Sequence, residues 1–292
     1  MIIDFLAIGH ISHDRTPEGF RLGGTVSYAA VTAHRLGRRP GVLTRGTTEG
    51  LGLDLAQGVT EKVTVPAGGP LAGVSLCLLP ATASTTFVNI YHDGRRRQII
   101  ETVAAPLTPE ELPPAWADVP IVLLGPIARE VPPAWLAAFP NALIGVTPQG
   151  WMRCWDAAGY VYPAPWESAV EFLQRADVLI LSREDVGGNE ETLADLARMA
   201  RLMVATDGWR GATLYRDGNS YYVPPRPANE VDPTGAGDVF ATAFLIRLAE
   251  TGDPLTAARF ANVVASFSVE APGVAGIPDR AQVEAWLAAS NE

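Results

Sequence analysis

The residues best suited to chemistry stand in one run, Val231-Asp232-Pro233-Thr234-Gly235-Ala236-Gly237-Asp238-Val239-Phe240. Gly235 and Gly237 let the backbone turn tightly and approach a ligand without an intervening Cβ. A helical pattern follows at once, so unpaired N–H groups and the positive end of a helix dipole face the turn and attract an anion. Asp238, in the first helical turn, is placed to take a proton from an attacking hydroxyl. The alternative is a plain glycine turn followed by a dipole-favoured aspartate.

Lysine is nearly absent from the chain. Among its 22 Lys and Arg residues the single lysine is Lys62, and no glycine-rich loop surrounds it. A Walker A loop ends in Gly-Lys-Ser/Thr and a protein kinase needs a strand lysine near a glycine-rich loop, so both classes are excluded. A Schiff-base enzyme would rest on one poorly placed amine. A phosphate site here must therefore use backbone amides, arginine, helix dipoles or a metal ion.

The composition is acidic, with 32 Asp and Glu against 22 Lys and Arg and a formal net charge of −10. That charge argues against a nucleic-acid partner and against an anionic membrane surface, because both need clustered positive charge. Cys77 and Cys154 form no zinc spacing and are too few for a disulfide scaffold. The sequence shows neither a signal-peptide pattern nor a long apolar run. We therefore expect a cytoplasmic protein.

Short apolar runs alternate with helical patterns along the chain. Buried parallel strands are predicted at 2–8, 119–124, 142–146, 178–181 and 202–206, with helices at 27–36, 133–139, 167–175 and 190–199. Three further helices are predicted at 238–250, 254–270 and 280–289. The alternation predicts the α/β class, as a doubly wound, mostly parallel sheet flanked by helices. Ligands of such sheets bind at the carboxyl ends of the strands.

Residues 62–101 interrupt this alternation of strands and helices. Strands are predicted at 72–79 and 85–91, and a hairpin turn at His92-Asp93-Gly94 leads into 95–101. Strands without intervening helices predict a small antiparallel β lid, built from about 12–22 and 62–101, on one domain that spans 1–292. A flap over an active site and the contact of a homodimer are both open interpretations, and a plain surface excursion is the simplest one.

The run around Asp238 closely resembles the second sequence pattern of the ribokinase-like, or PfkB, carbohydrate kinases. Other stretches resemble the same family in order, namely Gly9-His10-Ile11-Ser12-His13-Asp14, Gly23-Gly24-Thr25-Val26-Ser27-Tyr28-Ala29-Ala30 with Leu36-Gly37, Thr206-Asp207-Gly208-Trp209-Arg210-Gly211, and 262–278. The resemblance covers essentially the whole chain. It implies a ribokinase-like fold and an ATP-dependent kinase that phosphorylates a hydroxyl of a small sugar or polyol.

The resemblance also implies roles for individual residues. Asp238 would be the base, and the anion hole for the transferred phosphoryl group would comprise Gly235, Ala236 and Gly237. Substrate would be held by Asp14, Gly23 and Gly24. The nucleotide would be flanked by Thr206, Gly208, Gly211 and Asn262.

Two metal ions follow from the same resemblance. Mg²⁺ is the expected partner of the phosphates, but the family's usual Asn-x-x-Glu is Ser182-Arg183-Glu184-Asp185 here. Either Asp185 or Glu184 would then supply the carboxylate for a hydrated Mg²⁺. A K⁺ site would involve Asp232, Thr234, Ser268, Ala271 and Gly273, mostly through backbone carbonyls.

The substrate class rests on fewer residues. Tyr28 replaces the asparagine of ribokinase itself, which puts ribose in doubt. The stretch 146–153, with Gln149 and Arg153, and the stretch 86–98 are similar to members assigned to myo-inositol or related polyols. Gln149 and Arg153 would bond a polyhydroxylated ring, or else make ordinary loop contacts. A nucleoside kinase of the same fold and a non-catalytic sugar- or nucleotide-binding regulator remain alternatives.

Overall fold

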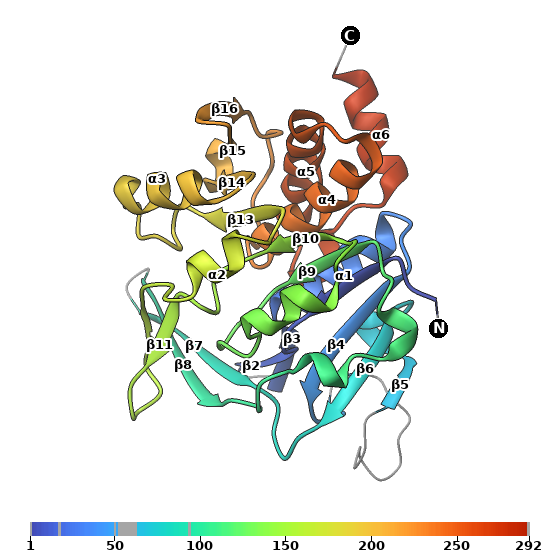
Figure 1. Ribbon diagram of the computed structural model, residues 1–292, viewed down its shortest axis with the longest axis vertical. Coiled ribbons are helices and arrows are strands. Elements are labelled where there is room, and N and C mark those ends of the chain that lie inside the picture. The colour runs from blue at the N-terminus through green and yellow to red at the C-terminus, as the bar shows by residue number, and fades with distance from the viewer. Residues whose placement is uncertain (1, 17–18, 50, 52–62, 93–94, 291–292) are drawn as a thin grey trace.

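The computed structural model describes residues 2–16, 19–49, 51, 63–92 and 95–290. Its main sheet is built from β1 (Phe5–Ile8), β4 (Pro40–Gly46), β5 (Val63–Pro66), β6 (Ser75–Pro80), β9 (Ile121–Leu124), β10 (Leu143–Val146), β13 (Val178–Ser182), β14 (Met203–Thr206), β15 (Ala212–Arg216) and β16 (Asn219–Val223). These ten strands lie in the order β16-β15-β14-β13-β10-β9-β1-β4-β6-β5 (Figure 1). All neighbours from β14 to β6 pair in parallel, and the outer pairs β16–β15, β15–β14 and β6–β5 are antiparallel.

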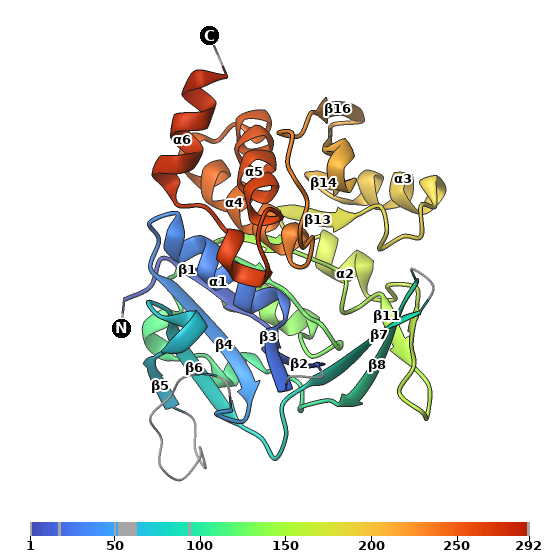
Figure 2. The same ribbon diagram turned by 180° about the vertical axis from the view of Figure 1, so that it is seen from behind.

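Helices cover both faces of this sheet. In β1, Phe5 and Ala7 pack in one core cluster and Leu6 and Ile8 in another, because successive side chains of a strand point to opposite faces. The first cluster is covered by α1 (Thr25–Arg35), α4 (Ala236–Thr251), α5 (Pro254–Ser268) and α6 (Arg280–Ala289), which Figure 2 shows turned toward the viewer. The second cluster is covered by α2 (Ala169–Leu173), α3 (Glu190–Met199) and two 3₁₀ segments, η3 (Pro114–Trp116) and η4 (Pro133–Ala138). A third 3₁₀ segment, η2 (Pro109–Glu111), contacts η4. The predicted doubly wound α/β architecture is confirmed.

A second, four-stranded sheet stands apart from the large one. Its strands are β2 (Ser12–Thr16), β3 (Gly19–Gly23), β7 (Thr86–His92) and β8 (Arg95–Thr102), in the order β3-β2-β7-β8. Two antiparallel hairpins are joined by the parallel pair β2–β7. Residues 93 and 94 of the predicted hairpin turn lie outside the described residues. We call these four strands the small sheet. A short hairpin, β11 (Arg153–Trp155) and β12 (Val161–Pro163), adjoins it through the bridge between Ile99 and Tyr160.

The predicted lid is too long, because its residues 63–80 belong to the large sheet, whereas residue 62 lies outside the described residues. Strand β6 pairs in parallel with β4, from Gly41–Ser75 to Gly46–Pro80, and β5 pairs with β6 at the edge of the large sheet. The reason is burial on both sides: Leu76 and Leu78 of β6 join one core cluster, whereas Cys77 and Leu79 join the other. Only a strand between two covered faces can bury alternate residues in this way.

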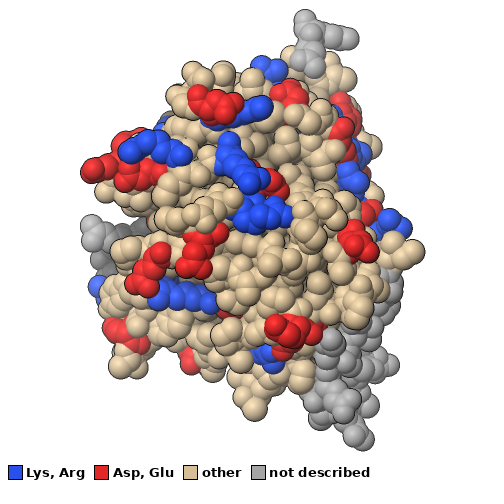
Figure 3. Space-filling view, viewed as in Figure 1, with Lys and Arg blue, Asp and Glu red and all other residues tan. Residues whose placement is uncertain are grey.

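Helix boundaries differ from the predictions in a few places. The segment predicted as a helix at 133–139 is the 3₁₀ segment η4, and α2 is shorter than predicted. Helix α5 begins after Asp253, whose carboxylate accepts hydrogen bonds from the N–H groups of Leu255 and Thr256. Among the described helices, none is both long and apolar enough to span a bilayer. Acidic and basic side chains are interspersed on the face shown in Figure 3.

Candidate active site

The glycine turn before α4 packs directly against α1. Gly235 caps α4 in the left-handed region, at φ 77°. A Cβ on Gly235 would lie only 2.2 Å from Cδ1 of Tyr28, a buried residue of α1. A Cβ on Gly237, in contrast, would meet no described atom within 4 Å outside the adjacent backbone of α4. The Tyr28 ring therefore packs against one side of the turn. The N–H groups of the turn lie at the N-terminus of the 16-residue helix α4, where a bound anion is favoured.

Asp238 lies in the first turn of α4, as predicted. Burial raises the pKa of its carboxyl to about 6. The negative charge of Asp185 raises this pKa further, whereas a hydrogen bond from the Thr25 side chain and the charge of Arg153 lower it. A carboxylate with a pKa of about 6 is ionised near neutral pH and is still basic enough to accept a proton from a reacting hydroxyl.

Asp185 lies at the carboxyl end of β13 and brings together residues from separate stretches of sequence. The Ser182 N–H donates to its carboxylate at 2.8 Å, and the Gln149 side chain also hydrogen-bonds to it. Burial raises the pKa of Asp185, although these hydrogen bonds and the charge of Arg153 lower it. Glu184 is exposed, so the structure favours Asp185 of the two predicted carboxylates. The predicted polyol residues Gln149 and Arg153 thus lie near enough to the predicted Mg²⁺ residue to influence its pKa.

The predicted substrate residues Asp14, Gly23 and Gly24 lie together beside Tyr28. Ser12 Oγ donates to Asp14 at 3.2 Å, and a Cβ on Gly23 would lie 3.0 Å from the Asp14 carboxylate. Gly24 caps α1 at φ 89°, where a Cβ would meet the His10 carbonyl. Burial, followed by the charges of three aspartates that include Asp14 and Asp238, raises the pKa of the Tyr28 phenol. The predicted substrate residues and the predicted base therefore lie in the same polar region.

The two halves of the predicted K⁺ site are joined by Asp232. Its carboxylate accepts hydrogen bonds from the Thr234 N–H at 3.0 Å and from the Gly273 N–H at 2.9 Å. Burial raises the pKa of Asp232, but hydrogen bonds from Thr234 and Gly273 outweigh that effect and hold the pKa below its usual value. The segment that carries Ser268 and Ala271 is tightly folded, because a Cβ on Gly276 would lie 2.3 Å from the Ser268 carbonyl oxygen.

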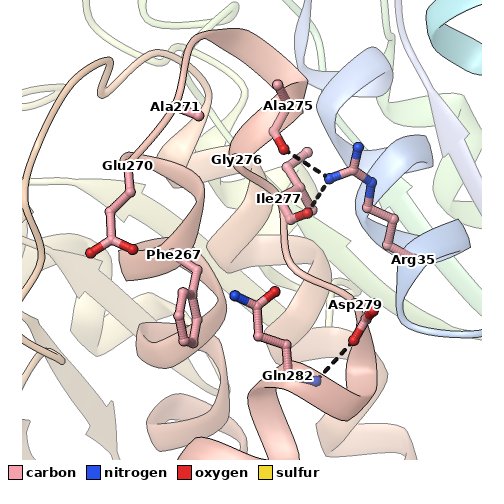
Figure 4. Close-up of a pocket in the computed structure, with 9 residues that line it drawn as sticks. All are labelled: Arg35, Phe267, Glu270, Ala271, Ala275, Gly276, Ile277, Asp279 and Gln282. Carbon is pink, nitrogen blue, oxygen red and sulfur yellow. Dashed lines mark hydrogen bonds between the residues drawn. The ribbon is translucent and has the colours of Figure 1, made fainter.

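A surface hollow of ≈ 460 Å³ lies behind this segment (Figure 4). Ala271 and Gly276 line it, and Arg35 from the last turn of α1 donates to the carbonyls of Ala275 and Ile277 inside it. None of the residues described around Asp238 lines this hollow. The hollow therefore adjoins the predicted K⁺ segment through Ala271 but does not reach the residues around Asp238.

The predicted nucleotide residues lie at the other edge of the site. Thr206 ends β14, and Gly208 and Gly211 have φ values of 53° and 87° in the turn that follows. A Cβ on Gly211 would lie 2.4 Å from the Val223 carbonyl oxygen. The Asn262 side-chain amide donates to the same carbonyl at 2.9 Å and to that of Pro224 at 3.0 Å. Asn262 therefore holds the end of β16 in place.

Two residues of the site were not predicted from the sequence. Thr25 hydrogen-bonds to Asp238, and the charge of Arg21 on β3 lowers the pKa of both Tyr28 and Asp232. The only sequence signal for Thr25 is its place directly after the glycine pair, at the first position of α1. Arg21 has no such signal, because its position depends on how the small sheet packs.

The described residues contain no cluster of three or more His, Cys, Asp or Glu that could enclose a metal ion. Mg²⁺ bound to a nucleotide keeps several waters and needs only one or two protein carboxylates. Asp185 fits that requirement, since its partly buried carboxylate lies close enough to Asp238 to raise the pKa of that residue.

Comparison with known proteins relates the chain to carbohydrate and nucleoside kinases. Residues 161–280 match the family model described as pfkB family carbohydrate kinase. The chain is 42% identical over 89 residues to ribokinase of Bacillus subtilis and 36% identical over 84 residues to inositol 3-kinase of Arabidopsis thaliana. These matches span 30% and 28% of this chain, and 30% and 24% of those relatives. A cytidine kinase of Thermococcus kodakarensis is 28% identical over 270 residues, which cover 84% of this chain and 88% of the relative.

Solved structures share the fold over nearly the whole chain. A pyrophosphate-dependent kinase in the ribokinase family, complexed with a pyrophosphate analog and myo-inositol, has a TM-score of 0.76 at 23% identity and covers 96% of this chain and 99% of its own. Ribokinase of Arabidopsis thaliana, complexed with ribose and ATP, has a TM-score of 0.70 at 20% identity and covers 98% and 99%.

Proposed function

We propose that this chain is a carbohydrate kinase of the pfkB family and that it transfers the γ-phosphoryl group of ATP to a hydroxyl of a small sugar or polyol. The observation that carries the proposal is Asp238, which combines a pKa of about 6 with a place in the first turn of α4, beside the Gly235–Gly237 turn. Phosphoryl transfer needs a positioned hydroxyl and stabilised charge more than covalent work by the protein.

In the proposed reaction each group of the chain has one task. Asp238 accepts the proton of the attacking hydroxyl. The N–H groups of Gly235, Ala236 and Gly237, at the positive end of α4, stabilise the negative charge of the transferred phosphoryl group. Arg153 adds positive charge near Asp238, since its charge lowers the pKa of that carboxyl. Asp14 and Gly23 hold the substrate on the side of Tyr28.

The proposed cofactors are ATP and Mg²⁺, with K⁺ as an activator. When bound, Mg²⁺ would supply positive charge that offsets the negative charge of the nucleotide phosphates. Asp185 would hold Mg²⁺ through water. Asp232 would hold together the two segments of the K⁺ site, which contain Thr234, Ser268, Ala271 and Gly273. The hydrogen bonds from Thr234 and Gly273 to Asp232 support the second assignment.

The proposed acceptor is an inositol-like polyol or a sugar. Supporting it are Gln149 and Arg153, which lie around Asp185 and close to the base and carry donors suited to ring hydroxyls. We also propose that the small sheet is the lid of this site, because its strands β2 and β3 carry Asp14 and Gly23. A homodimer through this lid and a cytoplasmic location remain predictions, of which light scattering tests the first.

An ADP-release assay over pentoses, hexoses, inositols and nucleosides, with and without K⁺, tests the function. We expect turnover with at least one sugar or polyol. Asp238→Asn should keep the fold and nucleotide binding but lose at least about 100-fold in kcat, the scale of general base catalysis. Asp195→Asn is the matched control, because Asp195 is an exposed residue of α3 paired with Arg198 at the surface. Full activity of Asp238→Asn would refute the assignment of the base.

A nucleoside kinase is the second candidate function, since the cytidine kinase match spans 84% of this chain. Turnover confined to nucleosides in the same assay would favour it. Pyrophosphate is tested as a second donor through the release of inorganic phosphate, because one similar fold belongs to a pyrophosphate-dependent kinase. Tight binding of sugar or nucleotide without turnover in any arm would favour a non-catalytic regulator instead.

A further inference from the structure

The loop between β16 and α4, residues 224–234, has little packing of its own. From residue 227 onward its side chains are exposed except for the half-buried Asp232, and none of them joins a core cluster of the described residues. The loop forms no helix or strand, yet it contains Asp232 and leads directly into the glycine turn at Gly235. Because packing does not hold this backbone, its hydrogen bonds must determine where it lies.

The end of α5 supplies these hydrogen bonds. The N–H groups of Val231 and Asp232 both donate to the Val269 carbonyl, at 2.8 and 3.0 Å. The Asp232 carboxylate accepts from the Gly273 N–H on the α5 side and from the Thr234 N–H on the loop side. The loop and the segment that follows α5 are therefore joined immediately before the glycine turn.

An ion pair between Arg226 and Glu270 fastens the other end of the same contact. Glu270 follows α5 and lies near Phe267 (Figure 4). Nη1 of Arg226 donates to Oε1 of Glu270 at 2.9 Å and Nη2 donates to Oε2 at 3.2 Å, which is a bidentate pair. The guanidinium carbon lies 3.8 Å from the centre of the Phe267 ring, and the Asn229 N–H donates to Oε1 of Glu270 at 3.3 Å. The side chains of the pair are only 14% and 30% exposed, so solvent screens this pair less than an exposed one.

We propose that Arg226 and Glu270 are positioning residues for the site: their bidentate pair fixes the 224–234 loop against the end of α5 and thereby determines where Asp232 and the glycine turn lie. This inference rests on the proposed phosphoryl transfer. Backbone N–H groups that stabilise a developing charge must be held in place before the reaction, because reorganisation during the reaction raises the barrier. The pair acts through the backbone that it holds and not on the substrate.

Amide hydrogen exchange, followed by NMR on the full chain without substrate, tests this hold on the loop. The side chain of Val231 is 57% exposed, so its N–H is protected by the bond to the Val269 carbonyl rather than by burial. Arg226→Met removes the charge and keeps a long side chain that can pack on Phe267. We expect the N–H groups of Val231 and Asp232 to exchange about 3- to 30-fold faster in this variant, the range for loss of a partly shielded charged hydrogen bond. Exchange in the central strands should stay unchanged.

Two further variants separate the pair from a general loss of stability. Glu270→Gln removes the charge but keeps an acceptor for the Asn229 N–H, and it should speed exchange as Arg226→Met does. The double variant should exceed neither single variant, because both substitutions break one interaction. Additive effects would contradict a direct pair. The matched control is Arg198→Met, which removes an exposed ion pair with Asp195 on α3 and should leave the loop amides unchanged.

Turnover tests whether the pair matters for the reaction. We expect kcat of Arg226→Met and Glu270→Gln to fall by about 3- to 30-fold. KM for the acceptor should stay within about twofold, because the proposed substrate residues Asp14 and Gly23 lie on the small sheet. Arg226→Lys keeps the charge without the bidentate fork and should give an intermediate kcat. If Arg226→Met does not fold, Arg226→Lys and Glu270→Gln provide the same comparison.

The two measurements separate the possible failures. Unchanged loop exchange in folded Arg226→Met or Glu270→Gln refutes the hold on the loop, whatever the activity. Faster exchange with a wild-type kcat refutes the positioning role. Faster exchange in a protein whose wild-type form shows no turnover refutes the proposed function and not the contact.

Discussion

Replacing Gly235 with alanine is the sharpest test of the glycine turn before α4. The new Cβ would lie 2.2 Å from Cδ1 and 2.3 Å from Cε1 of Tyr28, far inside van der Waals contact. Gly235 also has φ 77°, a left-handed conformation that costs an L residue about 1–2 kcal/mol. Overpacking of a buried contact adds about 1–3 kcal/mol. We therefore expect Gly235→Ala to lower the free energy of unfolding by about 2–5 kcal/mol.

Gly237→Ala provides the matched control on the same turn. Outside the adjacent backbone of α4, no described atom lies within 4 Å of its added Cβ, and alanine is favoured over glycine in a helix by about 0.5–1 kcal/mol. We expect its stability to equal or slightly exceed that of the wild type. Its activity should fall all the same, because the methyl group enters the space beside the N–H groups that are proposed to bind the phosphoryl group.

Urea unfolding at pH 7, followed by tryptophan fluorescence, measures both stabilities, and the ADP-release assay measures both activities. A wild-type unfolding midpoint for Gly235→Ala would refute the packing of Tyr28 against the turn. Full turnover by Gly237→Ala would refute the anion hole.

Three further predictions concern the base and the nucleotide edge. With a pKa of about 6 for Asp238, kcat/KM should show an acid limb near pH 6, and at pH 5 about one tenth of the enzyme should be active. A limb near pH 4, measured with saturating Mg²⁺, would contradict the desolvated base. Because the pKa of Asp238 is higher in the folded state than its usual value of 3.8, the charge of this carboxylate lowers the free energy of unfolding above pH 3.8. Asp238→Asn should therefore raise the free energy of unfolding at pH 7 by up to about 3 kcal/mol. In urea unfolding at pH 4 this gain should disappear. Asn262→Ala removes two hydrogen bonds to the carbonyls of Val223 and Pro224, which should lower the free energy of unfolding in urea by about 1–3 kcal/mol. The same variant should raise KM for the nucleotide. An unchanged KM would show that Asn262 does not contribute to the nucleotide site.

The central strands could be predicted because both of their faces are buried. Strands β1, β9, β10, β13 and β14 read as short apolar runs for that reason, and each lies where the sequence indicates. Strand β4 was not predicted, since Gly41, Thr44, Arg45 and Gly46 interrupt its apolar run. Strand β6 was predicted as a strand but assigned to the wrong sheet, because apolar periodicity does not identify a pairing partner.

The site was predicted only in part, for a similar reason. Asp238 and its glycines are local in sequence, so turn, helix start and base could be predicted together. The hydrogen bond from Gln149 to Asp185 and the contact between Thr25 and Gly125 join loops that are distant in the chain. Such contacts depend on which strand ends are neighbours in the sheet, and that order does not follow from local patterns.

The small sheet has a consequence for how the chain folds. Its parallel pair joins His13 to Thr86, and α1, β4, β5 and β6 lie between them in sequence. Pairing of such distant segments closes a long loop, which is slow to form unless the intervening chain is already ordered. The small sheet shares no strand with the large one. We therefore expect the small sheet to form after the ten-stranded body.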